Sequence, residues 1–196
     1  MLQPNKILVI RFSSLGDLIL TSPIFRELRR IFPGANLNLL TSVGFGDVLD
    51  NNPHLDRIIK HPRKENFEQL NQLIDELQAE EFDLIYDAHR SMRSRWIVSR
   101  LTAFGMKRKP AVWKINKRTL NRKLLIHLGW NRLQQGLSQR EQWLLPLKQH
   151  APHGLDASTE LFPDQEDTNL IETLMSEHNL LPRGFIAIGP SASQPL

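Results

Sequence analysis

Apolar runs and helical repeats alternate along most of this chain. Ile7–Ile10 is a continuous apolar run with the length and composition of a strand that is covered on both faces. Ser13, Ser14 and Gly16 supply a tight turn after it, and apolar residues then recur at helical spacing until a Pro-Gly pair ends the pattern. The start of the chain therefore predicts a buried strand that leads through a short turn into a helix.

The same alternation continues and predicts an α/β fold. Strands are expected at Lys6–Phe12, Asn36–Thr41, Arg57–Lys60, Asp83–Asp87 and Ala111–Lys114. Helices are expected at Asp17–Ile31, Phe45–Leu49, Phe67–Glu80, Met92–Phe104, Leu120–Leu128 and Gln139–Leu147. Strands that alternate with helices form βαβ units, whose right-handed crossovers produce a parallel sheet. Residues 1–149 are therefore expected to form one Rossmann-like domain.

The pattern changes at residues 150–166. This segment is rich in turn-forming residues and lacks periodicity, as expected of a linker between domains. A helix at Asp167–His178 and a strand at Phe185–Gly189 are expected after it, followed by a turn of small residues. A strand that enters such a turn is typical of the start of a nucleotide-binding half. Because 196 residues are few for two complete domains, residues 167–196 are expected to begin a second, truncated domain.

Asp17 stands where the first strand passes into the first helix. In open α/β sheets, ligands bind in the crevice beyond the carboxyl ends of the strands, and Asp17 follows the turn at that edge. Its carboxylate has two interpretations, a general base for a bound hydroxyl group or the acidic partner of Ser14 in a Ser-x-x-Asp capping box. Spacing alone favours the cap.

A second group of candidates closes the fourth predicted strand. Asp87 and His89 lie at the same edge of the sheet as Asp17, and several arginines, among them Arg93 and Arg95, begin the next helix. A helix N-terminus favours anions, so arginines there predict binding of phosphate or carboxylate groups. His89 is a candidate binding residue or a hydrogen-bonded spectator, and Asp87 has the alternative role of orienting His89 or capping the helix.

Two motifs resemble those of a known enzyme family. Ser13-Ser-Leu-Gly-Asp17 follows an Ile-Leu-Val-Ile strand and precedes Leu-Thr-Ser-Pro, and Asp87-Ala-His-Arg-Ser-Met-Arg-Ser-Arg95 follows a second strand. This arrangement resembles glycosyltransferase family 9, the ADP-heptose:lipopolysaccharide heptosyltransferases and their relatives. The resemblance extends over about residues 5–190 in the order of elements, and the first motif is the more specific one.

The resemblance implies an inverting, metal-independent enzyme that uses no cofactor and has Asp17 as its general base. It would transfer a heptose from an ADP-sugar, or another sugar from its nucleotide, to the lipopolysaccharide inner core. Residues 1–149 would be the N-terminal, acceptor-binding domain of a GT-B glycosyltransferase, and the 196-residue chain alone would be inactive. The implied substrate-binding residues are Ser13, Ser14, Gly16, Asp87, His89, Arg93, Arg95, Lys117 and Arg118, with Ser191 as a donor-binding residue. The alternative from another class is a non-catalytic Rossmann-like module that binds an anionic ligand.

The net charge of +4 conceals an uneven distribution. The segment from Ala88 to Arg140 contains no Asp or Glu but 14 of the chain's 25 Lys and Arg residues. Such a field attracts phosphorylated or carboxylated ligands and anionic membrane surfaces. The resemblance implies that these are the phosphates and Kdo carboxylates of an inner-core glycolipid, or the anionic inner leaflet. The alternatives are a solvated face and nucleic-acid binding, because Trp113 and Trp130 interleave with the basic residues. No nucleic-acid module pattern accompanies them, which disfavours the last alternative.

The composition also bears on the cellular location. The chain has no cysteine, and no stretch approaches the roughly 18 apolar residues of a membrane span. The N-terminus lacks the basic, apolar and small-residue regions of a signal peptide. We therefore expect a cytoplasmic protein that associates peripherally with the inner membrane.

Overall fold

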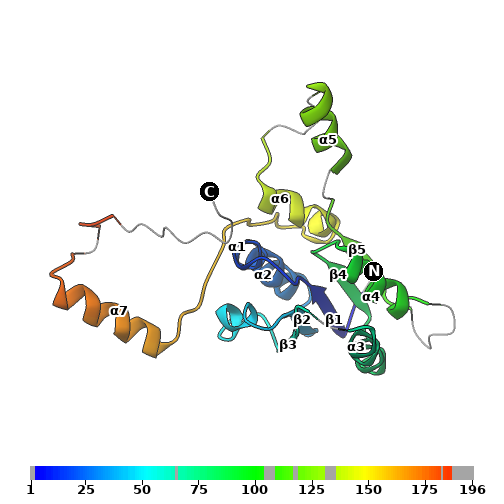
Figure 1. Ribbon diagram of the computed structural model, residues 1–196, viewed down its shortest axis with the longest axis horizontal. Coiled ribbons are helices and arrows are strands. Elements are labelled where there is room, and N and C mark those ends of the chain that lie inside the picture. The colour runs from blue at the N-terminus through cyan, green and yellow to red at the C-terminus, as the bar shows by residue number, and fades with distance from the viewer. Residues whose placement is uncertain are drawn as a thin grey trace. The chain divides into compact units, whose positions relative to one another are not determined.

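The computed structural model describes residues 3–64, 66–103, 109–116, 119–130, 136–181 and 183–186. Contacts divide the chain into two compact units, Met1–Leu161 and Phe162–Leu196. The first unit contains a five-stranded sheet with helices against it (Figure 1). In the second unit, α7 spans Gln165–Glu177. The strand predicted at Phe185–Gly189 lies largely outside the described residues, and its first two residues are not in a strand.

The sheet is parallel throughout, as the alternation of elements predicted. Its strands run in the order β3-β2-β1-β4-β5, the order of a Rossmann half, so β1 lies at the centre. The strands are β1 (Lys6–Ile10), β2 (Asn36–Ser42), β3 (Arg57–His61), β4 (Leu84–Asp87) and β5 (Ala111–Lys114). The predicted α/β, Rossmann-like fold class is therefore confirmed.

The helices of the first unit follow the strands in the predicted order. They are α1 (Leu15–Ile19), α2 (Ser22–Ile31), α3 (Phe67–Ala79), α4 (Met92–Leu101), α5 (Thr119–Leu128) and α6 (Gln139–Leu144). Two 3-10 helices, η1 (Gly46–Leu49) and η2 (Leu145–His150), accompany them. Each helix between two strands returns the chain to the amino edge of the sheet. All strands therefore deliver their carboxyl ends, and the residues that follow them, to one edge.

The prediction of one continuous helix at Asp17–Ile31 is wrong. The chain forms α1 and α2 with a break between them, where the Thr21 hydroxyl donates to the carbonyl oxygen of Asp17 at 2.6 Å. Pro23, in the first turn of α2, has no N–H for the carbonyl of Ile19 and so cannot continue the helical ladder. A proline has the same effect near the C-terminal part of the predicted helix Gln139–Leu147, where α6 passes into η2.

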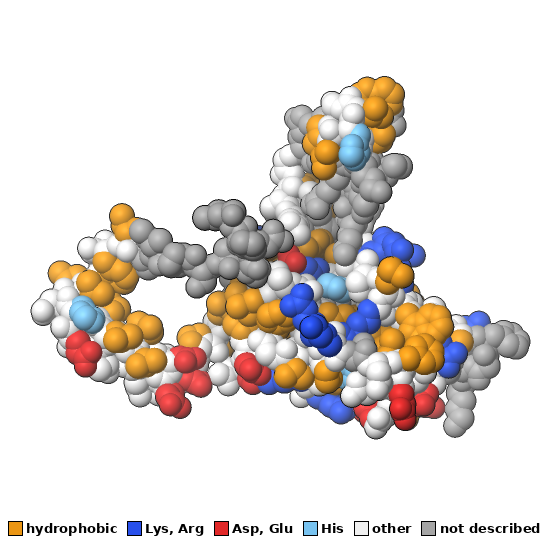
Figure 2. All heavy atoms as spheres, viewed as in Figure 1, with side chains coloured by type: hydrophobic (Ala, Val, Ile, Leu, Met, Phe, Trp, Pro, Cys, Tyr) orange, Lys and Arg blue, Asp and Glu red, His pale blue; other side chains and the backbone are white. Residues whose placement is uncertain are grey.

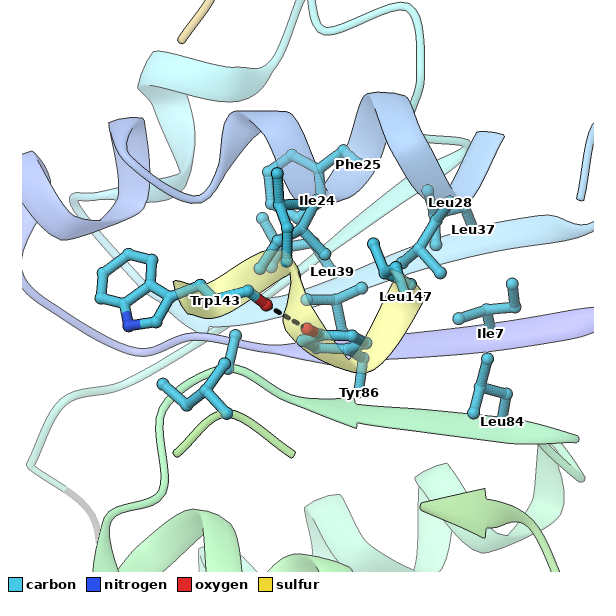
Figure 3. Close-up of a cluster of buried hydrophobic side chains, with 14 of the residues drawn as sticks. Ile7, Ile24, Phe25, Leu28, Leu37, Leu39, Leu84, Tyr86, Trp143 and Leu147 are labelled. Carbon is cyan, nitrogen blue, oxygen red and sulfur yellow. Dashed lines mark hydrogen bonds between the residues drawn. The ribbon is translucent and has the colours of Figure 1, made fainter. Parts of the chain in front are cut away.

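Apolar side chains fill both faces of the sheet. Along β1 they alternate, so that Ile7 and Val9 pack with α2, α6 and η2, whereas Leu8 and Ile10 pack with α3 and α4. The first of these clusters is closed by the Tyr86 hydroxyl, which donates to the carbonyl oxygen of Trp143 (Figure 3). Burial raises the pKa of Tyr86, so this hydroxyl stays a neutral donor. Because Trp143 belongs to α6 and Tyr86 to β4, this hydrogen bond attaches α6 to the sheet.

Part of the predicted linker packs on the first unit. The Arg26 guanidinium of α2 lies 3.1 Å from the Asp156 carboxylate and also pairs with Glu160. Leu155 and Ala157 contact the apolar cluster under α2. The boundary between the two units follows Leu161, inside the predicted linker at residues 150–166, because the residues before it are bound to α2.

Candidate active site

A buried arginine and a partly exposed aspartate meet at the carboxyl edge of the sheet. The Arg11 Nη2 atom lies 2.6 Å from Asp17 Oδ2, with side chains that are 5% and 34% exposed. Arg11 follows β1 directly, and Asp17 lies in α1 after the turn. The sequence analysis singled out Asp17 but missed Arg11, whose only sequence signal is a basic residue directly after a buried apolar strand.

The two carboxylate oxygens of Asp17 have different surroundings. Oδ2 receives the Arg11 contact and also accepts from the Ser14 N–H at 3.3 Å and from the Ser14 hydroxyl at 3.4 Å. Among the described residues, none binds Oδ1. The predicted cap therefore uses Oδ2, and the role of Asp17 as a base stays a prediction. The cap orients the side chain, and Oδ1 is left able to accept a proton.

Arg11 is held from several sides. Its Nη1 atom donates to the carbonyl oxygen of Ala88 at 2.6 Å, and its guanidinium carbon lies 4.7 Å from the centre of the Trp143 ring. Burial lowers the pKa of Arg11, while the carboxylates of Asp17 and Asp87 oppose that shift. An arginine remains charged in any case, so a cation stays beneath the candidate base. These contacts make Arg11 a rigid support for Asp17.

A cavity of about 200 Å³ opens next to this pair. It is lined by Arg11, Asp17, Ile115, Asn116, Gln139, Gln142 and Trp143. Three of these side chains are amides, which both donate and accept hydrogen bonds and so suit a ligand rich in hydroxyl groups. The volume is below the roughly 300 Å³ at which ligand pockets usually begin, so the cavity suits one ring of a larger ligand.

The cavity is built by segments that are distant in the sequence. Gln139 and Trp143 belong to α6, and Asn116 follows β5. Gln142, also on α6, donates from Nε2 to the carbonyl oxygen of Leu137 at 3.0 Å. The α6 residues reach Asp17 because the apolar side of α6 packs on the cluster that also buries α2. The helix predicted at Gln139–Leu147 therefore supplies one wall of the site.

Asp87 has the capping geometry that the sequence analysis gave as its alternative role. Its Oδ1 atom accepts from the N–H groups of His89 at 3.1 Å and Arg90 at 2.7 Å, and its Oδ2 atom from the Ser94 hydroxyl at 3.2 Å. The side chain is buried. These contacts bind the start of α4 to the end of β4, and a substrate role for Asp87 stays a prediction.

His89 and Arg93 lie on the other face of the sheet from the Arg11–Asp17 pair. Phe12 packs in the cluster under α3 and α4, with the His89 ring edge-on at a centroid distance of 5.8 Å. The guanidinium carbon of Arg93 lies 4.0 Å from the centre of the Phe12 ring, and its Nη2 atom donates to the Pro62 carbonyl at 3.0 Å. Because side chains alternate after β1, Arg11 faces the cavity and Phe12 faces these two residues.

The remaining candidates are dispersed. Ser13 is half-buried and Gly16 is exposed in the turn before Asp17, and a Cβ added at Gly16 would meet no atom within 4 Å. The turn therefore leaves open space over Gly16. Arg95 is exposed on α4. Lys117, Arg118 and Ser191 lie outside the described residues.

Arg90 has a backbone conformation that glycine adopts easily. Its φ of 50° is in the left-handed region, which is unfavourable for a residue with a Cβ. In this chain the Arg90 Nη1 atom donates to the carbonyl oxygen of Ile115 at 3.2 Å. Arg90 thus holds the end of β5, where the lining residues Ile115 and Asn116 lie.

Neither a metal-binding cluster nor a membrane-spanning helix is present among the described residues. Across the described ranges, His, Asp and Glu residues do not gather in a group of three or more that fits a metal ion. In the same part of the chain, every helix is too short or too polar to cross a membrane. The predicted absence of a metal stays a prediction.

Comparison with known proteins agrees with the two motifs. No protein-family model matches the chain. Lipopolysaccharide heptosyltransferase 1 of Pseudomonas aeruginosa is 27% identical to it over 101 residues, which are 47% of this chain and 28% of that protein. The chain therefore spans well under two thirds of the length of this curated relative.

Solved structures extend the likeness to the fold. The glycosyl transferase family 9 from Veillonella parvula DSM 2008 matches with a TM-score of 0.67 and 20% identity, over 92% of this chain and 52% of that chain. The E. coli heptosyltransferase WaaC with ADP-2-deoxy-2-fluoro heptose matches with a TM-score of 0.53 and 21% identity, over 79% and 50%. The predicted Rossmann-like fold is thus confirmed, and over the matched part it is the fold of these glycosyltransferase structures. In its sequence and its fold, this chain resembles a fragment of the family 9 glycosyltransferases.

Proposed function

We propose that this chain is the acceptor-binding part of an inverting sugar transferase, with Asp17 as the general base. The observation that carries the proposal is the Asp17 carboxylate beside an amide-lined cavity, anchored through Oδ2 and contacted at Oδ1 by none of the described residues. An inverting transfer needs one base close to the acceptor hydroxyl, which loses its proton as the oxygen attacks the anomeric carbon. The turn before Asp17 leaves space over Gly16 for that acceptor.

We propose an ADP-linked heptose as the donor and an anionic lipopolysaccharide precursor as the acceptor. The support is the name of the Pseudomonas aeruginosa relative and the ADP-sugar analogue in the solved E. coli heptosyltransferase. The acid-free segment from Ala88 to Arg140 supplies positive charge for an anionic acceptor. A transferase of the same family for another sugar uses the same base and cavity.

The leaving diphosphate needs positive charge or amide dipoles to stabilise it. The pair of Arg11 and Asp17 is close to neutral as a whole, so this charge has to come from elsewhere. We propose that it is supplied after residue 161, by the second nucleotide-binding half that residues 167–196 begin. The 196-residue chain alone is then expected to transfer no sugar and to bind nucleotide sugars weakly.

A panel of donors tests the substrate proposal. The complete protein is incubated with a heptose-deficient lipopolysaccharide acceptor and either ADP-heptose, a second ADP-sugar or a UDP-sugar, and the product is weighed by mass spectrometry. We expect the acceptor to gain one heptose and the other donors to react far more slowly. Efficient transfer of a different sugar would move the proposal to another member of the family. Ligand binding without transfer from any donor would favour the non-catalytic module.

A further inference from the structure

Three large apolar side chains are exposed together on α3 and α4. Phe67, Met92 and Trp96 are 68%, 89% and 42% exposed. The rings of Phe67 and Trp96 are 6.4 Å apart between centroids, and Met92 is four residues before Trp96 on the same side of α4. The three residues, called the apolar patch below, therefore form one surface that spans the two helices.

The core does not account for the apolar patch. The two helices bury other side chains against the sheet, namely Leu73, Ile74 and Leu77 of α3 and Ile97 and Leu101 of α4. Single exposed apolar residues are common, but two aromatic rings and a methionine in one group are not. In the space-filling view, hydrophobic side chains gather in the region of α4, with Lys and Arg side chains beside them (Figure 2). Such a patch marks a surface that another phase or molecule covers.

Exposed cations flank the apolar patch. Arg63 and Lys64 precede α3, and Arg95 lies on α4 between Met92 and Trp96. The hydrogen bond from Arg93 to the Pro62 carbonyl, 3.0 Å long, attaches the segment of Arg63 and Lys64 to the start of α4. Glu68 is an exposed acid next to Phe67, and the sequence has a second acid, Glu65, between Lys64 and Phe67, so the three cations leave a balance of one positive charge.

The surface also lies at the edge of the sheet that carries the candidate base. The chain leaves β3 at His61 and enters α3 at Phe67, and it leaves β4 at Asp87 and enters α4 at Met92. Because the strands are parallel, both connections lie at the carboxyl edge, as does Asp17. A membrane at this surface would bring its lipids to the edge at which the cavity opens.

We propose that the apolar patch, with Arg63, Lys64 and Arg95, docks the chain on an anionic phospholipid membrane. Phe67, Met92 and Trp96 enter the boundary between headgroups and acyl chains, where aromatic side chains are favoured. The cations meet lipid phosphates, and each is attracted by the negative surface potential. A stable protein interface buries roughly 800 Å² per partner and 20 or more residues, which is far more than three side chains offer.

This inference goes beyond the acid-free segment of the sequence. Arg63, Lys64 and Phe67 precede Ala88, so the surface exists only where the fold brings α3 and α4 together. It does not depend on the proposed transferase activity. Lipid binding and sugar transfer are measured separately, and failure of either leaves the other standing.

Vesicle co-sedimentation with the full chain tests the proposal. The vesicles contain phosphatidylethanolamine and phosphatidylglycerol, and matched vesicles contain phosphatidylcholine alone. The wild type is expected to bind the anionic vesicles more strongly, and added salt should weaken the binding because it screens the cations. The combined substitutions Phe67→Ser, Met92→Gln and Trp96→Gln are expected to lower the partition coefficient by about tenfold or more, since three apolar side chains no longer enter the lipid.

Two controls accompany the triple variant. Ile126→Gln changes an apolar side chain that is 75% exposed on α5, outside the apolar patch, and should bind as the wild type does. Thermal unfolding should show that the triple variant remains folded, with a small loss of stability from the Trp96 ring, which is 42% exposed and packs against Phe67. Wild-type binding that the triple substitution leaves unchanged, or absence of binding to anionic vesicles, would overturn the proposal. So would sedimentation of the wild type as a dimer that the triple variant abolishes, because the surface would then belong to a second copy.

Discussion

Replacing Asp17 by asparagine is expected to slow sugar transfer by the complete protein at least about 10²-fold, the usual contribution of a general base. In the wild type, Oδ2 of Asp17 accepts from the Ser14 N–H at 3.3 Å. Asparagine keeps an oxygen for this hydrogen bond, but it cannot take a proton from the acceptor. Donor affinity should change little, because the substitution removes a group that acts in the transition state. Initial rates at saturating substrate and calorimetric titration with the donor measure the two quantities.

Asp47→Asn is the matched control for this experiment. Asp47 is a surface carboxylate that pairs with Lys60 at 2.7 Å and has no part in the candidate site. We expect its variant to transfer sugar at the wild-type rate. If Asp17→Asn instead showed near-normal turnover with a lower melting temperature, Asp17 would be a helix cap and the proposed base would be wrong.

Replacing Arg11 by methionine is expected to reduce both stability and activity. The carbonyl oxygen of Ala88 loses its donor in a buried position, which costs roughly 1–3 kcal/mol of unfolding free energy. Asp17 is 34% exposed and is rehydrated, so the broken ion pair costs less than the roughly 3–5 kcal/mol of a fully buried pair. Methionine retains apolar contact with Trp143. The rate of transfer should fall as well, because Oδ2 of Asp17 loses its strongest anchor.

Urea denaturation measures the change in stability, and initial rates measure the change in activity. Two further variants serve as controls. Arg57→Met changes an arginine with a 57% exposed side chain, so it should alter stability by no more than about 0.5 kcal/mol. Arg11→Lys keeps the charge but not the fork of donors that reaches both Ala88 and Asp17, so it should restore only part of the activity. An Arg11→Met protein with the wild-type rate and stability would show that Arg11 does not support Asp17.

The strands and most helices could be predicted because each follows from a local signal. Ile7–Ile10 is apolar without interruption since β1 is central and covered on both faces. The break between α1 and α2 was not predicted because the apolar repeat continues across Thr21. Pro23 is the sequence signal that indicates the break. Hydrophobic periodicity indicates which side chains face the core, but it does not indicate where a backbone hydrogen bond is lost.

The candidate site was only half visible in the sequence. Asp17 could be found because strand, turn and acid are adjacent, whereas Trp143 and Gln139 reach it from α6 through tertiary packing alone. Arg11 looked like the end of a strand, and its pairing depends on the alternation that sends Phe12 to the opposite face. Asp87 shows the reverse case. Its position at the end of a strand suggested a substrate-binding residue. In the fold its carboxylate holds the start of α4, and a substrate role stays a prediction.

The anomeric configuration of the product is the most direct test of the central claim. A base at Oδ1 of Asp17 that activates the acceptor for a single displacement requires inversion at the anomeric carbon, because the oxygen attacks opposite to the leaving diphosphate. The complete protein is supplied with ADP-heptose and acceptor, and the new glycosidic bond is analysed by nuclear magnetic resonance. We expect a configuration opposite to that of the donor. A retained configuration, or an acceptor that gains no sugar, would contradict it.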